Sequence, residues 1–172
     1  SYSGHGSQIQ DTTGLEKSGL DDVICPIDFA TAGFITDNYL LASFVKRIPQ
    51  NVNMMCIFDS CHNATILDIP YTYDLSIGSI AVDYPSSVSI ALPNIACISG
   101  SRDNQTSADA YINNRANGAF TWAFLKAMKD KNYSVNCHDL VQQVITDLQS
   151  EGFSQFPILS LSRISTLEEK YL

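Results

Sequence analysis

The chain reads VNMMCIF from Val52 to Phe58 and continues directly as DSCH from Asp59 to His62. A short, continuous apolar run bounded by Asn and Asp is typical of a strand that is buried on both faces. Cys61 therefore follows the end of a strand, and open α/β sheets bind ligands beyond the carboxyl ends of their strands. This stretch predicts an α/β fold and places a reactive thiol where an active site belongs.

The segments around this strand alternate between helix and strand patterns. Apolar residues recur at helical spacing in three segments, Thr36–Ile48, Asn117–Lys129 and Asn136–Leu148. Further short apolar runs predict strands at Ile95–Ser99 and Phe156–Leu161, and a small hairpin or irregular excursion from Ile77–Val82 and Val88–Leu92. Residues 1–35, rich in Gly, Ser, Asp and Thr, are predicted to be loops. The alternation predicts one α/β domain with a sheet flanked by helices.

Composition excludes several classes of protein. With 172 residues, 45% of them hydrophobic and 16% charged, the chain has an ordinary globular composition. Its net charge of −8 is opposite to that of a nucleic-acid binder, and no apolar run approaches the roughly 18 residues of a membrane span. Five cysteines without a Cys-X-X-Cys pair indicate reduced thiols. We therefore expect a cytoplasmic protein that binds neither nucleic acid nor membranes.

A second segment, YSGHGS from Tyr2 to Ser7, also contains a candidate catalytic residue, His5. His5 lies between Gly4 and Gly6, so the backbone can turn tightly there and a substrate can approach closely. Cys61 follows His5 by 56 residues. In caspases the histidine precedes the cysteine by about 50 residues.

Ser-Gly-His-Gly followed by Asp-Ser-Cys-His resembles the dyad signature of caspase-like cysteine peptidases, and the closer resemblance is to type I metacaspases. It extends to four further stretches: Gly19–Phe29, Asp68–Tyr73, Ser99–Ala110 and Gly118–Leu125. The family fold is a mostly parallel sheet flanked by helices, in which two strands precede the strand before the histidine. Only four residues precede His5 here, so the resemblance implies a caspase-like domain over residues 1–172 that lacks its N-terminal strands. Its large-segment part covers residues 1–75 and its small-segment part residues 95–172.

The resemblance implies a cysteine endopeptidase in which Cys61 is the nucleophile and His5 the general acid and base. An imidazolium beside the thiol stabilises the thiolate and later protonates the leaving amine. The family supplies the oxyanion donors from the backbone N–H groups of Gly6 and Cys61. The competing interpretations are a lone cysteine that is only a small buried hydrophobe, an inactive scaffold or binding module, and peptide ligation through the same acyl-enzyme.

The resemblance also assigns Asp59 and Ser3 to the pocket for the substrate's P1 side chain, with Arg or Lys preferred. Asp59 precedes Cys61 by two residues, so in an extended segment both side chains point to the same side. A carboxylate there favours a cationic P1 group. The alternative is that Asp59 only accepts backbone N–H groups at the turn.

Many metacaspases are activated by calcium, and Asp21, Asp37 and Asp68 match ligand positions of that family. Calcium prefers several oxygen ligands, and carboxylates from separate loops suit it. Asn38 stands where the family often has another Asp, which predicts weaker binding. The alternative is a set of solvated loop carboxylates, with Asp37 as a helix-start acid. No organic cofactor is expected.

Basic residues are absent from the connection after the cysteine. Between Arg47 and Arg102 the chain has no Lys or Arg. An enzyme specific for basic residues could not cut itself there, so we expect one uncut chain that works as a monomer on peptide or protein substrates.

Overall fold

The computed structural model describes residues 1–14, 16, 18–60, 65–75, 77–82, 91–100, 109–112, 115–168 and 170. Its centre is a six-stranded sheet in the order β1-β5-β8-β11-β6-β7. The six strands are Tyr2–Ser3 (β1), Asn53–Asp59 (β5), Asn94–Ser99 (β8), Ile158–Leu161 (β11), Tyr71–Asp74 (β6) and Ser79–Val82 (β7). β1, β5 and β8 are parallel neighbours, whereas β11, β6 and β7 each pair antiparallel to the strand before them in this order. Four of the six strands, β1, β5, β8 and β6, therefore point the same way, which confirms the predicted α/β class with a mainly parallel sheet.

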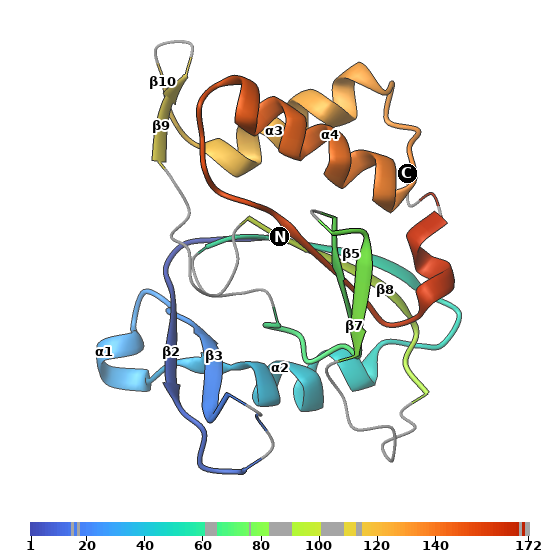
Figure 1. Cartoon of the computed structure of the whole chain (residues 1–172). Coiled ribbons are helices and arrows are strands. Elements are labelled where there is room, and N and C mark those ends of the chain that lie inside the picture. Colours follow the sequence, from blue (N-terminus) through green and yellow to red (C-terminus); the bar gives the residue numbers. More distant parts are fainter. Residues whose placement is uncertain are drawn as a thin grey trace.

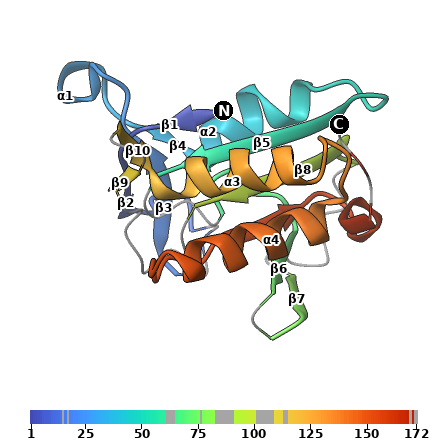
Figure 2. The same ribbon diagram turned by 90° about the horizontal axis from the view of Figure 1, so that it is seen from above.

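Helices cover both faces of the sheet (Figures 1 and 2). On one face lie α3 (Ala119–Asp130) and α4 (Cys137–Ser150), which pack with Ile98 and Leu159 into one apolar core. On the other face lie α2 (Asp37–Ser43) and the 3₁₀ turn η1 (Val45–Arg47), which pack with Phe58 into a second core. Alternate residues of the central strands thus pack into two different cores, as expected for strands buried on both sides.

Smaller elements gather at the carboxyl end of the parallel strands (Figure 2). They are the antiparallel sheet of β2 (Gly6–Gln10), β3 (Leu20–Ile24) and β4 (Ile35–Thr36), the short helix α1 (Phe29–Ala32), and the hairpin of β9 (Asp109–Ile112) with β10 (Arg115–Gly118). α3 begins at this end because it follows β10 directly. The end of the sheet that carries the predicted site is therefore enclosed by several additional segments.

Most of the predicted elements are confirmed, and their capping explains their bounds. Asn136 caps α4 by accepting the backbone N–H of Asp139 at 2.8 Å, and Thr36 caps α2 by accepting that of Tyr39 at 3.1 Å. The helix predicted over Thr36–Ile48 divides at Phe44 into α2 and η1.

One prediction of local structure was wrong. Residues 1–35 contain four strands and a helix instead of loops. These strands have two to five residues, which is too short for periodicity to indicate them. The strand at Ser79–Val82 pairs with β6, which the sequence did not indicate. Its predicted partner Val88–Leu92 lies for the most part outside the described residues.

In the described part of the chain, no helix is long and apolar enough to cross a membrane. The thiols of Cys56, Cys97 and Cys137 are buried, and that of Cys25 is half-buried. None of these four cysteines forms a disulfide within the described part of the chain.

Candidate active site

The structure brings the histidine motif and the cysteine motif together through the pairing of β1 with β5. Ser3 lies opposite Asp59 in this parallel pair, and the backbone N–H of Gly4 donates to the Asp59 carbonyl at 3.3 Å. The two motifs are therefore side by side at the carboxyl end of the sheet, although more than 50 residues separate them in the sequence. Cys61 and His62 lie outside the described residues.

His5 stands in the exposed connection between β1 and β2. Its backbone carbonyl accepts the Tyr2 hydroxyl at 2.8 Å and the Cys25 N–H at 3.0 Å. Gly4 makes this turn possible, because a Cβ atom there would lie 2.6 Å from the Tyr2 hydroxyl oxygen. The backbone of His5 is thus held in place while its side chain remains accessible to a substrate.

Gly6 begins β2 and lies opposite Ile24 of β3. The bond from the Cys25 N–H to the His5 carbonyl identifies Gly6 and Ile24 as a pair that does not exchange hydrogen bonds. The N–H of Gly6 therefore points away from β3. This orientation is compatible with the oxyanion role that the sequence assigns to Gly6.

Asp59 is buried at the end of β5, and its carboxylate faces the start of α3. Its Oδ2 accepts the Thr121 backbone N–H at 3.2 Å and also the Thr121 hydroxyl. In the alternative interpretation of the sequence, Asp59 accepts backbone N–H groups of its own turn. Asp59 does accept a backbone N–H group, but this group belongs to α3, a helix distant in the sequence. Ser3, its neighbour in the sheet, is exposed.

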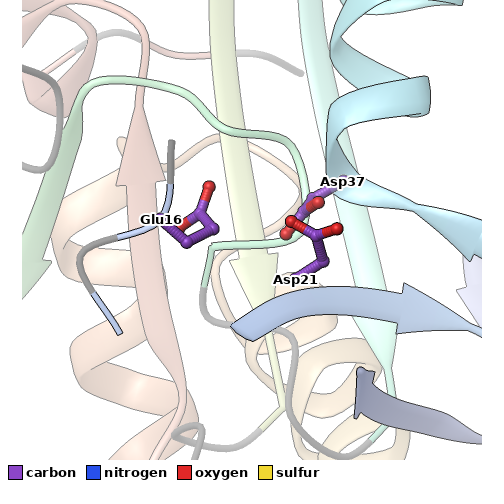
Figure 3. Close-up of side chains that lie close together, drawn as sticks. All are labelled: Glu16, Asp21 and Asp37. Carbon is purple, nitrogen blue, oxygen red and sulfur yellow. The ribbon is translucent and has the colours of Figure 1, made fainter. Parts of the chain in front are cut away.

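A second group of side chains forms an acidic cluster (Figure 3). Asp21 of β3, Asp37 at the start of α2 and Glu16 each offer a carboxylate oxygen, and these oxygens lie within 4.8 Å of one another. Asp21 and Asp37 are buried. The sequence predicted these two as ligands, whereas Glu16 was missed because nothing in its loop distinguishes it from a solvated acid.

Asp68, the third predicted ligand, is buried beside this cluster. Burial raises its pKa to about 8, and the charge of Asp37 is the second cause. Its Oδ2 has no hydrogen-bond partner among the described residues. Its backbone has a φ of 49°, in the left-handed region that Asp adopts more often than most other non-glycine residues. A buried carboxylate oxygen that has no donor among the described residues and lies close to other acids fits the oxygen ligands that calcium takes.

Hydrogen bonds organise the acids around the cluster. Asp37 accepts the backbone N–H groups of Asp22 and Asn38 at 2.6 and 2.7 Å. Burial nevertheless raises the pKa of Asp37 to about 7, because these bonds only partly offset desolvation and the charge of Asp21. The Asn38 side-chain amide donates to Asp21 at 2.9 Å. The carboxylates are thus kept close together in spite of their mutual repulsion.

The Asp22 carboxylate links the two motif segments. It accepts Gln8 of β2, the strand directly after His5, and Thr65, which lies four residues after Cys61, each at 2.9 Å. Gln8 and Thr65, the partners of Asp22, gave no signal in the sequence. The acidic cluster therefore lies where the segments after His5 and after Cys61 meet.

The cluster predicts that the calcium-free chain loses stability as the pH rises. Asp37 and Asp68 have folded-state pKa values of about 7 and about 8, whereas an unfolded Asp titrates near 3.9. Between these values the folded state holds protons that the unfolded state has lost. The free energy of unfolding should therefore fall by up to about 1.4 kcal/mol per pH unit and group between roughly pH 4 and 8.

Urea denaturation in EDTA at pH 5 and pH 8 measures this slope. Asp68→Asn removes one of the two groups, so it should flatten the slope and stabilise the chain at pH 8 by roughly 1–4 kcal/mol. Asp139→Asn, which changes an exposed carboxylate on α4, is the matched control and should keep the wild-type slope. Equal slopes in wild type and Asp68→Asn would contradict the assignment.

Comparison with known proteins finds similarity to metacaspases. Residues 1–70 match the family model of the metacaspase, peptidase C14 domain. Metacaspase-1 of Kluyveromyces lactis is 32% identical over 94% of this chain and 47% of its own length, and Metacaspase-1 of Coccidioides immitis is 35% identical over 94% of this chain and 44% of its own length. The chain thus spans about half the length of these relatives.

A crystal structure of a protein from Geobacter sulfurreducens has the same fold, with a TM-score of 0.62 over 99% of this chain and 68% of that one. The two sequences are 23% identical, so this similarity concerns the fold alone.

Proposed function

Because this chain is a relative of the metacaspases along almost its whole length, we propose that it is a cysteine endopeptidase that cleaves peptide bonds after Arg or Lys. The observation that supports this proposal most is the pairing of β1 with β5, which sets Ser3 beside Asp59 at the carboxyl end of the sheet. His5 follows Ser3 by two residues, and Cys61 follows Asp59 by two residues. The two motifs therefore leave the sheet next to each other.

In the proposed reaction the Cys61 thiolate attacks the carbonyl carbon of the scissile bond. The negative charge on the carbonyl oxygen is stabilised by the N–H groups of Gly6 and Cys61. The His5 imidazolium gives its proton to the leaving amine, and a thioester remains. His5 then takes a proton from water, which attacks the thioester and releases the carboxylate product and the thiol. No third catalytic residue is required.

Asp59 and Ser3 supply the proposed P1 pocket. A buried carboxylate pairs with a guanidinium or an ammonium group, whereas an acidic P1 side chain would place two carboxylates together. The burial of Asp59 and its position next to Ser3 support this assignment.

We further propose that calcium stimulates the enzyme through Asp21, Asp37 and Asp68. The fit rests on Asp68 Oδ2, which has no hydrogen-bond partner among the described residues, and on the raised pKa values of all three carboxyls. Burial is the largest cause of these shifts and the negative charge of neighbouring acids adds to it, so a positive charge would be needed to keep the three carboxyls ionised together. Calcium would supply that charge. The residues of the cluster and their neighbour Asp22 would then hold the segments after His5 and after Cys61 in one arrangement.

Calcium should therefore raise the rate of cleavage of an Arg-P1 peptide, with half-stimulation at high micromolar to millimolar concentration. Asp68→Ala should blunt this response, because it removes a ligand oxygen that has no hydrogen-bond partner in the described part of the chain. Asp139→Asn should retain it, since this carboxylate is exposed on the outer side of α4. Titration of initial rates with buffered calcium measures the effect, and equal rates in calcium and in EDTA would remove calcium from the mechanism.

The proposed enzyme works as a monomer. The absence of Lys and Arg between Arg47 and Arg102 removes the sites at which a basic-specific peptidase could cut the connection after Cys61.

A further inference from the structure

The start of α3 is built in an unusual way. Gly118 is its N-cap residue and provides no side-chain cap. In most helices the N-cap side chain accepts the backbone N–H of the second or third helical residue. Here Thr121 is the third residue, and its N–H donates to Asp59 Oδ2 of β5. Asp59 thus caps α3 from another part of the chain.

Gly118 permits this contact because it has no side chain. A Cβ atom at Gly118 would lie 2.1 Å from Asp59 Oδ2 and 2.9 Å from Asp59 Cγ. The carboxylate therefore occupies the space in which a capping side chain of residue 118 would otherwise stand. Since φ at Gly118 is −66°, backbone conformation does not demand glycine there. The close approach of Asp59 explains why residue 118 is a glycine.

Two donors on Thr121 contact the same oxygen of the Asp59 carboxylate. The backbone N–H and the hydroxyl both reach Oδ2, and the helix N-terminus favours the negative charge. We infer that Thr121 is a positioning residue for substrate specificity: together with Gly118 it orients the Asp59 carboxylate toward the P1 side chain. This inference rests on the proposed function, because it assumes that Asp59 receives a basic P1 group.

The contact also joins the two parts of the domain. Asp59 belongs to the part that carries His5 and Cys61, whereas Thr121 and Gly118 belong to the part after residue 95. P1 recognition would then depend on the correct docking of α3 onto the end of β5, although α3 itself need not touch the substrate.

The experiment compares two peptides that differ only in an Arg or a citrulline at P1, because citrulline has the shape of arginine without its charge. Thr121→Val removes the hydroxyl donor and keeps the backbone donor. We expect the ratio of kcat/KM for Arg over citrulline to fall roughly tenfold, mainly through KM of the Arg peptide. Thr121→Ser restores the hydroxyl and should return the ratio to near its wild-type value. Gly118→Ala would place a methyl group against the Asp59 carboxylate and displace it, so this variant should also lower the ratio.

Thr146→Val is the matched control, since the Thr146 hydroxyl donates only to the Gln142 carbonyl within α4 in the described structure. It should leave the ratio unchanged. Thermal unfolding of each variant shows whether the chain stays folded. A variant in which kcat/KM falls equally for the Arg peptide and the citrulline peptide has only a structural defect.

An unchanged ratio in folded Thr121→Val, with an active wild type that prefers Arg, would overturn the positioning role and leave the proposed function intact. A wild type that does not prefer Arg over citrulline would instead overturn the proposed P1 pocket and the positioning role together.

Discussion

Cys61→Ala and His5→Ala are each expected to lower kcat/KM for an Arg-P1 peptide by roughly a thousandfold or more, with folding unchanged. The first variant removes the atom that forms the thioester, and the second removes the group that activates the thiol and protonates the leaving amine. Because the two residues act as a unit, the double variant should be little slower than either single variant. Initial rates with a fluorogenic peptide, in saturating calcium, measure all three.

Matched controls are available for both substitutions. Cys25→Ala changes the half-buried free thiol, and His138→Ala changes a histidine on α4 that lies against Tyr73. Both should keep most of the activity. Iodoacetamide should also label Cys61 faster than the other four thiols, because a nearby imidazolium favours the thiolate. Normal activity of Cys61→Ala would refute the dyad, and slow labelling of Cys61 would favour the inactive scaffold.

Asp59→Asn is expected to lower kcat/KM for an Arg-P1 peptide by roughly 30-fold to several thousandfold, which corresponds to the roughly 2–5 kcal/mol lost when one partner of a buried charge pair is removed. Asn remains a good helix-capping residue, so its oxygen can still accept the N–H of Thr121. The substitution thus removes the charge while preserving the cap of α3.

The citrulline-P1 peptide is the control substrate, because its cleavage should depend much less on the charge of residue 59. Its kcat/KM should change far less than that of the Arg peptide. A similar loss for both peptides would mean that the charge of Asp59 does not select the P1 side chain. A wild-type preference for Asp at P1 would refute the pocket altogether.

The sequence indicated the long elements well. The strand before Cys61 and helices α3 and α4 have continuous apolar runs or apolar stripes, and Asn136 marked the start of α4. The short strands β1 to β4 and the pairing of β6 with β7 had no such signal, because two to five residues do not establish a period and their partners lie elsewhere in the chain. β1 is the clearest example, since its two residues gain their structure from β5.

The sequence by itself determined the residue types of the candidate site and their order. His5 between glycines, Cys61 after a buried strand, and the acids Asp21, Asp37 and Asp68 are properties of local sequence. Tertiary structure alone decided which of these groups meet and what surrounds them. It added Glu16 to the acidic cluster, left Asp68 Oδ2 without a hydrogen-bond partner among the described residues, and directed Asp59 onto Thr121. Such contacts follow from strand register and helix docking, and so does burial, which raises the pKa of a carboxyl only after the chain has removed water from it.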